Sequence, residues 1–304
     1  MLPTRNGSIR IFRFAGIDVY LHWMWFLAAI YQVSYGSRRY TSFVWCIYEY
    51  LALFGIVLMH EFGHALACRS VGGKADQIVL WLLGGVAYVD PPPRPGAMLW
   101  SIVAGPLVNV LLIPVFGGLV LLAGMHHLAD SSPNLNEFIN TIWLINVYIL
   151  EFNLLPIYPL DGGKILWSLL WFAFGRARSL MIASALGLVT VAALLVALFV
   201  FNYARENSWL ILIAVFALFQ CWSGFQQARG MSRIAAAPRH AGLACPNCKS
   251  PPPKGDFWIC GHCRRPFDIF ATRGVCPHCG MIFNVTRCLE CGQINPLHAF
   301  TQPS

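Results

Sequence analysis

The sequence FVWCIYEYLALFGIVLMHEFGHALAC, residues 43–68, is an apolar run that carries the pattern His-Glu-x-x-His near its end. On a helix, His60 and His64 lie one turn apart on the same face, so their ring nitrogens can share one zinc ion. Glu61 then lies beside the metal, where a general base is needed. Patterns this short also arise by chance, so the interpretation depends on what the rest of the chain places near these residues.

The composition predicts a membrane protein. Of the 304 residues, 57% are hydrophobic and 11% are charged, whereas charged residues make up about a quarter of a soluble domain. A bilayer-crossing helix needs roughly 20 apolar residues. We expect an all-α polytopic protein with about six transmembrane helices, at residues 17–35, 43–68, 97–124, 137–158, 179–201 and 208–225. A seventh run, residues 165–175, is shorter and predicts a half-helix or an interfacial helix.

The distribution of basic residues predicts the orientation of these spans. With the N-terminus in the cytosol, all 21 Lys and Arg except Arg38, Arg39 and Arg205 lie on the cytosolic side, as the positive-inside rule requires. We expect a multi-pass protein of the bacterial inner membrane with both termini in the cytosol. The net charge of +8 comes from membrane flanks and the tail, so nucleic acid is not an expected partner.

A third metal ligand is expected, because catalytic zinc sites usually have three protein ligands and a water. In this orientation His60 and His64 lie about one to two turns from the cytosolic end of their helix. The fourth run also ends on the cytosolic side, in NLLPIYPLDGG at residues 153–163, so Asp161 reaches a similar depth. Two prolines break the helix and the Gly-Gly pair permits a bend towards the metal. Alternatively, Asp161 caps a helix that starts near Lys164.

Together these motifs resemble those of the site-2 protease family of intramembrane zinc metalloproteases. The matching sequences, which fall within residues 9–225, are HEFGH at 60–64, Asn153-x-x-Pro156-x-x-Pro159-Leu160-Asp161-Gly162, GPLVN at 105–109 and Gly16-Ile17-x-Val19-x-Leu21-His22-Trp23. The resemblance implies a three-helix catalytic core formed by the second, third and fourth runs. It also implies that His60, His64 and Asp161 bind the catalytic zinc. Glu61 would be the general base, and the substrate a membrane-spanning protein.

The implied chemistry is hydrolysis of a peptide bond. Zinc lowers the pKa of its water towards about 7, and Glu61 accepts the proton and later protonates the leaving amine. Asn153 could hold the substrate backbone or the oxyanion, although an intramembrane asparagine can also tie helices together. We therefore predict an intramembrane zinc metalloendopeptidase that cleaves membrane-embedded segments near the cytosolic side, in regulated intramembrane proteolysis. The alternatives are a catalytically silent scaffold whose tail binds protein or nucleic acid, and a small-solute transporter.

Residues 72–95 predict a substrate-binding element. The stretch QIVLWLLGGVAYV, residues 77–89, is rich in β-branched and aromatic residues and is followed by three prolines, which indicates a short hairpin or a re-entrant edge β segment. An exposed strand edge can pair with an extended peptide. A surface connector is the alternative. We expect substrate contacts from Ile78, Leu80, Gly84, Gly85 and Val86.

Two acidic and two asparagine residues within the apolar runs also call for an interpretation. Glu49 and Glu151 are unfavourable in lipid and are expected to face the interior of the bundle. Asn109 and Asn146 are expected to join helices by hydrogen bonds rather than to take part in catalysis.

Four Cys-x-x-Cys pairs lie in the C-terminal tail and predict two structural zinc sites. The pairs are separated by 11, 12 and 8 residues. Disulfides are disfavoured in the cytosol, and metal binding is expected to supply most of the stability of so small a fold. Interleaved pairing is left open. Sequential pairing would place one zinc on Cys245, Cys248, Cys260 and Cys263 and the other on Cys276, Cys279, Cys288 and Cys291.

Three regions follow from these patterns. Residues 1–230 are predicted to form a transmembrane metalloprotease domain, residues 231–242 a linker, and residues 243–304 a cytosolic double zinc-ribbon domain. The chain would then bind three Zn2+ ions, one catalytic and two structural. A regulatory protein or the substrate is the expected partner of the tail, and a purely structural cap is the alternative.

Overall fold

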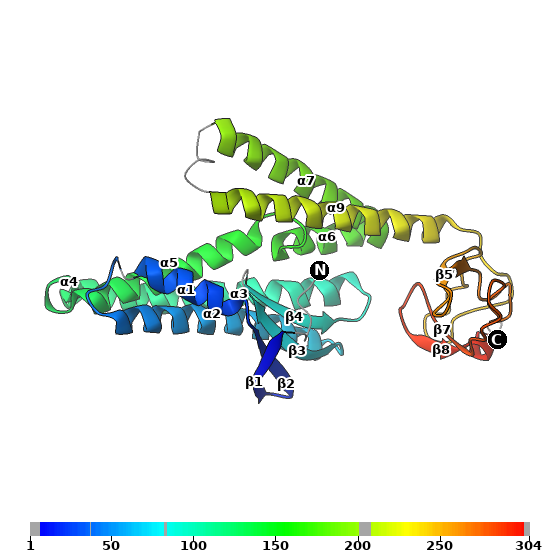
Figure 1. Cartoon of the computed structure of the whole chain (residues 1–304), viewed down its shortest axis with the longest axis horizontal. Coiled ribbons are helices and arrows are strands. Elements are labelled where there is room, and N and C mark those ends of the chain that lie inside the picture. The colour runs from blue at the N-terminus through cyan, green and yellow to red at the C-terminus, as the bar shows by residue number, and fades with distance from the viewer. Residues whose placement is uncertain (1–6, 37, 82–83, 201–207, 301–304) are drawn as a thin grey trace. The chain divides into compact units, whose positions relative to one another are not determined.

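The computed structural model describes residues 7–36, 38–81, 84–200 and 208–300, drawn in Figure 1. The chain divides into two compact units, Met1–Gly224 and Phe225–Ser304, which have separate hydrophobic cores. The predicted outer charge Arg205 and the pair Leu82-Leu83 of the predicted hairpin lie outside the described residues.

Helices make up most of the larger unit. α3 and α5 each begin with a proline, whose fixed φ suits the first turn and whose missing N–H is not needed there. α6 begins at Asp161, so this candidate ligand lies at a helix N-terminus, after the turn that follows α5. The helix bounds are α1 Trp25–Gly36, α2 Phe43–Ser70, α3 Pro95–Met125, α4 Leu128–Ser131, α5 Pro133–Leu154, α6 Asp161–Phe174, α7 Arg176–Val200 and α9 Ser208–Ala236, which continues into the second unit.

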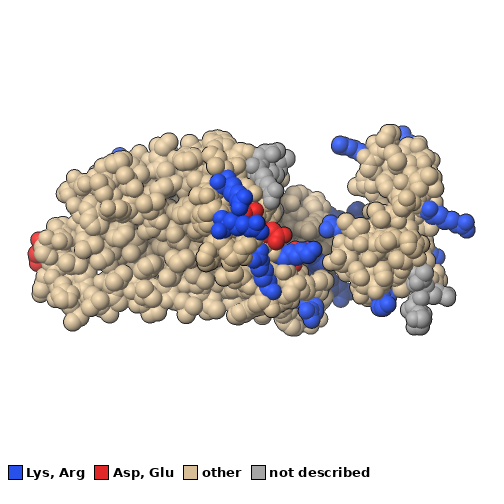
Figure 2. Space-filling model, turned by 90° about the horizontal axis from the view of Figure 1, so that it is seen from below, with Lys and Arg blue, Asp and Glu red and all other residues tan. Residues whose placement is uncertain are grey.

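Three helices in the described part of the chain are long and apolar enough to cross a membrane, namely α2, α3 and α7. Figure 2 shows that most of the visible face of the larger unit carries no charged side chain. These features support a membrane protein, whereas the total of six spans stays a prediction. A first helical span over residues 17–35 is wrong, because residues 17–22 form a strand. α1 has only 12 residues, about 18 Å of helix.

A four-stranded sheet lies beside α2. Its strands are β1 Ser8–Phe14, β2 Ile17–His22, β3 Lys74–Trp81 and β4 Gly84–Asp90, in the order β1-β2-β3-β4. β3 pairs in parallel with β2 and antiparallel with β4, which confirms the hairpin predicted within residues 72–95. The two N-terminal strands were not predicted. β4 is an edge strand, since only β3 pairs with it among the described strands.

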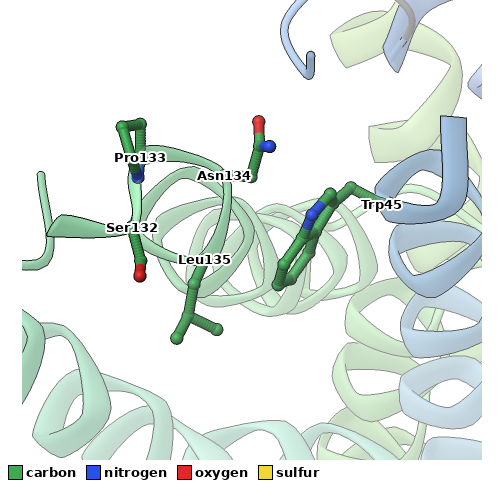
Figure 3. A pocket seen from close by; sticks show the side chains of 5 residues that line it. All are labelled: Trp45, Ser132, Pro133, Asn134 and Leu135. Carbon is green, nitrogen blue, oxygen red and sulfur yellow. The ribbon is translucent and has the colours of Figure 1, made fainter. Parts of the chain in front are cut away.

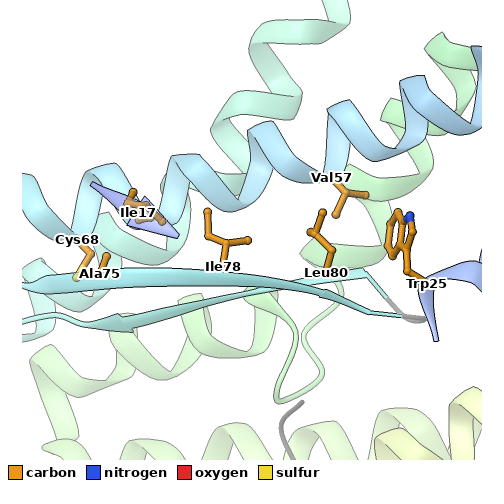
Figure 4. Packing of buried hydrophobic residues seen from close by; sticks show 8 residues of the cluster. Ile17, Trp25, Val57, Cys68, Ala75, Ile78 and Leu80 are labelled. Carbon is orange, nitrogen blue, oxygen red and sulfur yellow. The ribbon is translucent and has the colours of Figure 1, made fainter. Parts of the chain in front are cut away.

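The core of the larger unit packs the sheet against α2. Ile17, Ile78 and Leu80 are fully buried and point from the sheet towards Val57 and Cys68 of the helix (Figure 4). Burial of such aliphatic side chains contributes about 1.5–3 kcal/mol each. This packing holds the β3–β4 hairpin along the C-terminal half of α2, the half that carries the His-Glu-x-x-His pattern. A surface connector is excluded.

The predicted interior position of Glu49 is confirmed, whereas that of Glu151 is wrong. Glu49 is fully buried, and its carboxylate accepts hydrogen bonds from Gln32 and, at 2.7 Å, from Arg39. Arg39 also donates to Thr141 of α5. Burial of this charge is tolerated because it is paired, and the cluster joins α1, α2 and α5. Glu151 lies on an exposed face of α5.

The second unit contains two small antiparallel sheets. β5 Trp258–Ile259 pairs with β6 Pro266–Phe267, β7 Val285–Arg287 pairs with β8 Ile294–Pro296, and the 3-10 turn η1 Leu297–Ala299 follows. α9 continues through Ala236, so the predicted linker at 231–242 is helical at its start. The alanine-rich sequence there favours helix, and Pro238 follows it.

Candidate active site

The larger unit brings His60, His64 and Asp161 together. His60 Nε2 and His64 Nε2 lie 3.0 and 3.1 Å from Asp161 Oδ2, and 3.1 Å from each other. All three side chains are buried. The two histidines come from successive turns of α2, and Asp161 reaches them because the chain turns after α5 and starts α6 at that residue.

The other ring nitrogens determine which nitrogen of each histidine is free. His64 Nδ1 lies 2.9 Å from the carbonyl oxygen of Ser101, which can only accept, so Nδ1 donates. His60 Nδ1 lies 2.6 Å from Asn109 Oδ1, also an acceptor. Both Nε2 atoms therefore carry lone pairs directed at the Asp161 carboxylate.

This donor set fits a zinc ion. Two imidazole nitrogens and a carboxylate oxygen converge on one point, and three acceptors at about 3 Å repel one another unless a cation lies between them. Hydrogen-bonded Nδ1 atoms are the usual support of zinc-binding histidines. The residues present therefore match a three-ligand zinc site with a fourth position for water or substrate.

One face of α3 is shaped to this site. Ser101, Gly105 and Asn109 follow one another at intervals of four, so they share that face. A Cβ on Gly105 would lie 2.3 Å from His64 Nε2 and 2.9 Å from His60 Nε2. Only glycine permits α3 to approach the two rings this closely.

Glu61 lies under the edge strand of the sheet. Its side chain is 6% exposed, and its Oε2 accepts a hydrogen bond of 2.7 Å from the N–H of Ala87 on β4. A Cβ on Gly85 would lie 2.3 Å from Glu61 Cγ, so β4 also passes directly over the carboxylate. The candidate base thus has a defined position between α2 and β4.

Two of the predicted substrate contacts are wrong. Ile78 and Leu80 are fully buried because β3 is an interior strand whose side chains pack on α2, so a substrate cannot reach them. Gly84, Gly85 and Val86 lie on β4 and are partly exposed.

No contact in the described structure supports the predicted catalytic role of Asn153. Its amide donates to Ile149 O one turn earlier in α5, and the described part of the chain shows it no hydrogen bond to the histidines, Glu61 or Asp161.

Several residues beside the ligands were not predicted as part of the site. Ser101 and Asn109 accept from the histidines, and Lys164 Nζ lies 3.9 Å from Asp161 Oδ1. For Asn109, the available signal was its four-residue spacing from Gly105 within GPLVN. A backbone carbonyl such as that of Ser101 leaves no mark in a sequence.

The cysteines of the second unit form two sets that differ from the predicted sequential pairing. Each set has its ligand atoms within 4.8 Å of one another, and the sulfur pairs across each set lie 3.6 to 3.8 Å apart. Tetrahedral Zn–S bonds of about 2.3 Å place sulfurs about 3.8 Å apart, whereas a disulfide needs about 2 Å. The arrangement is nested, with an outer set Cys245, Cys248, Cys288 and Cys291 and an inner set Cys260, Cys263, Cys276 and Cys279.

Within the inner set, the backbone favours a thiolate at Cys260, whereas burial and the neighbouring thiols raise the pKa of Cys279. Hydrogen bonds from the backbone N–H groups of Cys263 and His262 lower the pKa of Cys260 to about 6, and the thiolate is the form that binds metal.

A cavity of about 260 Å³ lies elsewhere in the larger unit, near the start of α2 (Figure 3). It is lined by Trp45, Ser132, Pro133, Asn134 and Leu135. Among these residues, Asn134 has its amide already bonded to Thr41. This cavity offers no metal ligand and is separate from the histidines.

Comparisons with known proteins match the chain to a peptidase family. The sequence profile of peptidase family M50 matches residues 48–131 and 115–197, which include all three candidate ligands. A zinc metalloprotease of Methanocaldococcus jannaschii is 33% identical over 216 residues, covering 70% of this chain and 59% of the relative. The chain thus spans about three fifths of that relative's length.

Two further similarities cover more of the compared protein. The Bacillus subtilis protein YwhC is 30% identical over 162 residues, which cover 42% of this chain and 72% of YwhC. The solved structure of the site-2 protease from Methanocaldococcus jannaschii is 28% identical, with a TM-score of 0.49, and the match covers 72% of this chain and 95% of that one.

Proposed function

Because the chain belongs to peptidase family M50, we propose that its larger unit is a membrane-embedded zinc metalloendopeptidase that hydrolyses peptide bonds of membrane-spanning proteins. The observation that carries the proposal is the convergence of His60, His64 and Asp161, with donor atoms 3.0 to 3.1 Å apart, next to a buried Glu61. A ligand set and a base are the two parts that metal-assisted hydrolysis needs. A silent scaffold needs neither.

His60, His64 and Asp161 would hold the zinc, which when bound supplies Lewis acidity to polarise water and the scissile carbonyl. Glu61 accepts the proton of the attacking water and transfers it to the leaving amine. The Ala87 N–H supports this role, because it keeps the carboxylate of Glu61 in one orientation at the edge of the sheet.

The free edge of β4 is the proposed substrate site. An extended peptide can add to an edge strand through main-chain hydrogen bonds, and Gly84, Gly85 and Val86 offer backbone with little side-chain obstruction. The N–H of Ala87 on this edge is already bonded to Glu61. A peptide that pairs there would therefore bind directly beside the candidate base. Asn153 remains a candidate for holding the substrate.

The proposed topology keeps both termini in the cytosol of a bacterium, with cleavage near the cytosolic side of the inner membrane. α5 and α9, with 22 and 29 residues, would cross with α2, α3 and α7.

The first crossing would consist of β2 and α1 in series. Ile17 packs in one cluster with Cys68, whereas a Cβ on Gly36 would lie 3.2 Å from Cys46 Sγ. These cysteines are 22 residues apart on α2, about 33 Å of helix.

Labelling with a membrane-impermeant thiol reagent in intact cells tests the topology. A cysteine at Ser42, just before α2, should react from outside, and one at Lys74, just after it, should not. Labelling of the Lys74→Cys variant alone would reverse the proposed orientation.

Glu61→Gln is the decisive test of activity. Loss of a general base lowers turnover about 10²–10⁴-fold, whereas zinc content should be unchanged because glutamine replaces no ligand. Cleavage of a panel of single-span membrane proteins, co-expressed with the full-length wild type or the variant, is measured by immunoblot. If the variant cuts the panel as the wild type does, or if zinc-loaded wild type cuts none of it, the scaffold alternative is favoured.

Zinc content of the full-length protein tests the metal assignment. We propose three ions, one in the larger unit and two in the tail. His60→Ala should lower the count by one, and Cys245→Ser with Cys248→Ser should also lower it by one. An unchanged count in the His60→Ala variant would contradict the catalytic site.

The tail is proposed to bind a regulatory protein. Ile259, Ile282 and Ile294 are 71%, 66% and 68% exposed, and exposed apolar side chains mark protein contacts more often than nucleic-acid contacts. Replacing all three with serine should leave the zinc count at three and alter cleavage in cells but not cleavage by the purified protein. Altered cleavage by purified protein would assign them to the enzyme itself.

A further inference from the structure

Three buried side chains connect the candidate metal site to α5. His60 Nδ1 on α2 contacts Asn109 Oδ1 on α3 at 2.6 Å, and Asn109 Nδ2 donates to Asn146 Oδ1 on α5 at 2.8 Å. Asn146 Nδ2 returns a hydrogen bond of 3.0 Å to the backbone carbonyl of Asn109. Asn109 and Asn146 are both fully buried, so water does not compete for these groups.

The two amides hold each other in one orientation. Asn146 Nδ2 is fixed by the Asn109 carbonyl, which can only accept, so Asn146 presents Oδ1 to Asn109. Asn109 must then present Nδ2 to Asn146 and Oδ1 to His60. A flip of either amide would place two donors or two acceptors against each other inside the protein.

This orientation decides the state of His60. An amide oxygen only accepts, so His60 must carry its proton on Nδ1 and direct the lone pair of Nε2 towards Asp161. His64 needs no such help, because its Nδ1 faces the backbone carbonyl of Ser101. The two histidines are therefore supported unequally, one by the fixed backbone of α3 and the other by two side chains that end on α5.

We propose that Asn109, oriented by Asn146, is a positioning residue that sets the tautomer and ring orientation of His60 and thereby the affinity of the site for its metal. This inference rests on the metal site of the proposed function but does not require that the protein cleave peptides. It gives the pair a role beyond joining helices.

The test is zinc affinity of the full-length protein in detergent, measured by competition with a chelator. The thiolate sites of the tail act as an internal reference, and His60→Ala identifies the zinc of the larger unit. Asn109→Leu, which keeps the volume but removes the acceptor, should weaken that zinc by about 10- to 100-fold. Asn109→Asp keeps the acceptor for His60 but places a second acceptor against Asn146 Oδ1, so it should hold this zinc more tightly than Asn109→Leu without reaching the wild-type affinity. Asn140→Leu on α5 is the control, because the Asn140 amide donates to Asn136 O within the same helix.

The outcomes separate the inference from the proposed function. If wild type and His60→Ala hold equal zinc, both fail. If wild type holds the zinc and Asn109→Leu does so equally well, the inference fails alone. A role in helix packing alone predicts that the leucine and aspartate variants lose zinc together with the folded state. Should Asn109→Leu not fold, Asn146→Ala serves instead, since it removes the orienting amide without touching His60; it should weaken the same zinc, and unchanged affinity would overturn the proposal.

Discussion

At the scale of single residues, the site depends on Gly105, which has no side chain. Gly105 lets α3 lie against both imidazoles, and any Cβ there would occupy the space of His64 Nε2. The position of the ligands is therefore determined as much by the neighbouring helix as by the His-Glu-x-x-His pattern itself.

Gly105→Ala should abolish zinc binding in the larger unit. The added methyl, 2.3 Å from His64 Nε2, must displace the ring from its ligand position, and overpacking of this kind costs about 1–3 kcal/mol. The zinc count should fall from three to two. Gly118→Ala on the same helix is the control, since its Cβ would meet nothing within 4 Å. Full zinc content in the Gly105→Ala variant would show that the ring can move without loss of the metal.

In the second unit, Asp268 is the residue on which the fold between the cysteines depends. It accepts from the backbone N–H groups of Gly255, Phe270 and Ala271 and contacts His240. Burial opposes its ionisation, but the hydrogen bonds from Gly255, Ala271 and His240 outweigh it and lower the pKa of Asp268.

Asp268→Asn should destabilise the tail by about 1–3 kcal/mol, because its new NH2 group cannot accept from these donors. The exposed Asp256 supplies the control in Asp256→Asn. Thermal release of the two tail zincs, followed with a colorimetric indicator, would measure the difference. Equal release temperatures in the two variants would rule out this role for Asp268.

At the scale of elements, β4 is both the lid over Glu61 and the edge proposed to receive substrate. The two roles depend on the same strand because Gly85 and Ala87, two residues apart, both meet Glu61. Any change that lifts β4 should therefore affect proton transfer before it affects the metal.

Gly85→Ala should lower turnover and leave the zinc count at three. The new Cβ would overlap Glu61 Cγ at 2.3 Å, so either β4 or the carboxylate must move, and loss of correct placement of the base can cost up to about 10²-fold. Val86→Ala on the same strand is the control. Loss of zinc from the Gly85→Ala variant would show that β4 supports the ligands and not only the base.

At the scale of the whole molecule, the sequence predicted the parts that depend on local pattern. His60 and His64 follow from helical spacing, and Asp161 follows from the depth at which the fourth run ends. Residues 17–22 were placed in a membrane helix because alternating Ile17, Val19 and Leu21 also make an apolar run. They form a strand because they pair with β1, just before them in the chain, and with β3, more than 50 residues away. For the same reason, Ile78 was expected to be accessible to substrate. Its burial depends on the strand beside it, which the local sequence does not reveal.

The nested cysteine sets likewise lay beyond the sequence, because four equivalent Cys-x-x-Cys pairs permit several pairings with similar spacing. Because one set lies within the other, the two tail sites are expected to bind zinc in a preferred order. The loop between the two outer pairs consists of a connector of 11 residues, the inner set at residues 260–279, and a connector of 8 residues. Closing the inner set first removes about half of the loop that the outer set must close, which is worth about 0.6 kcal/mol.

The tail should therefore load from the inside outwards. Cys260→Ser with Cys263→Ser should weaken the outer zinc at least about threefold through loop closure alone. Phe270 packs both against Trp258 of the inner cluster and against Phe300 beside the outer set, so lost packing adds to this. Cys245→Ser with Cys248→Ser should leave the inner affinity nearly unchanged. Zinc starvation would then favour loss of the outer ion first, so partly depleted protein should hold the inner zinc alone more often than the outer zinc alone.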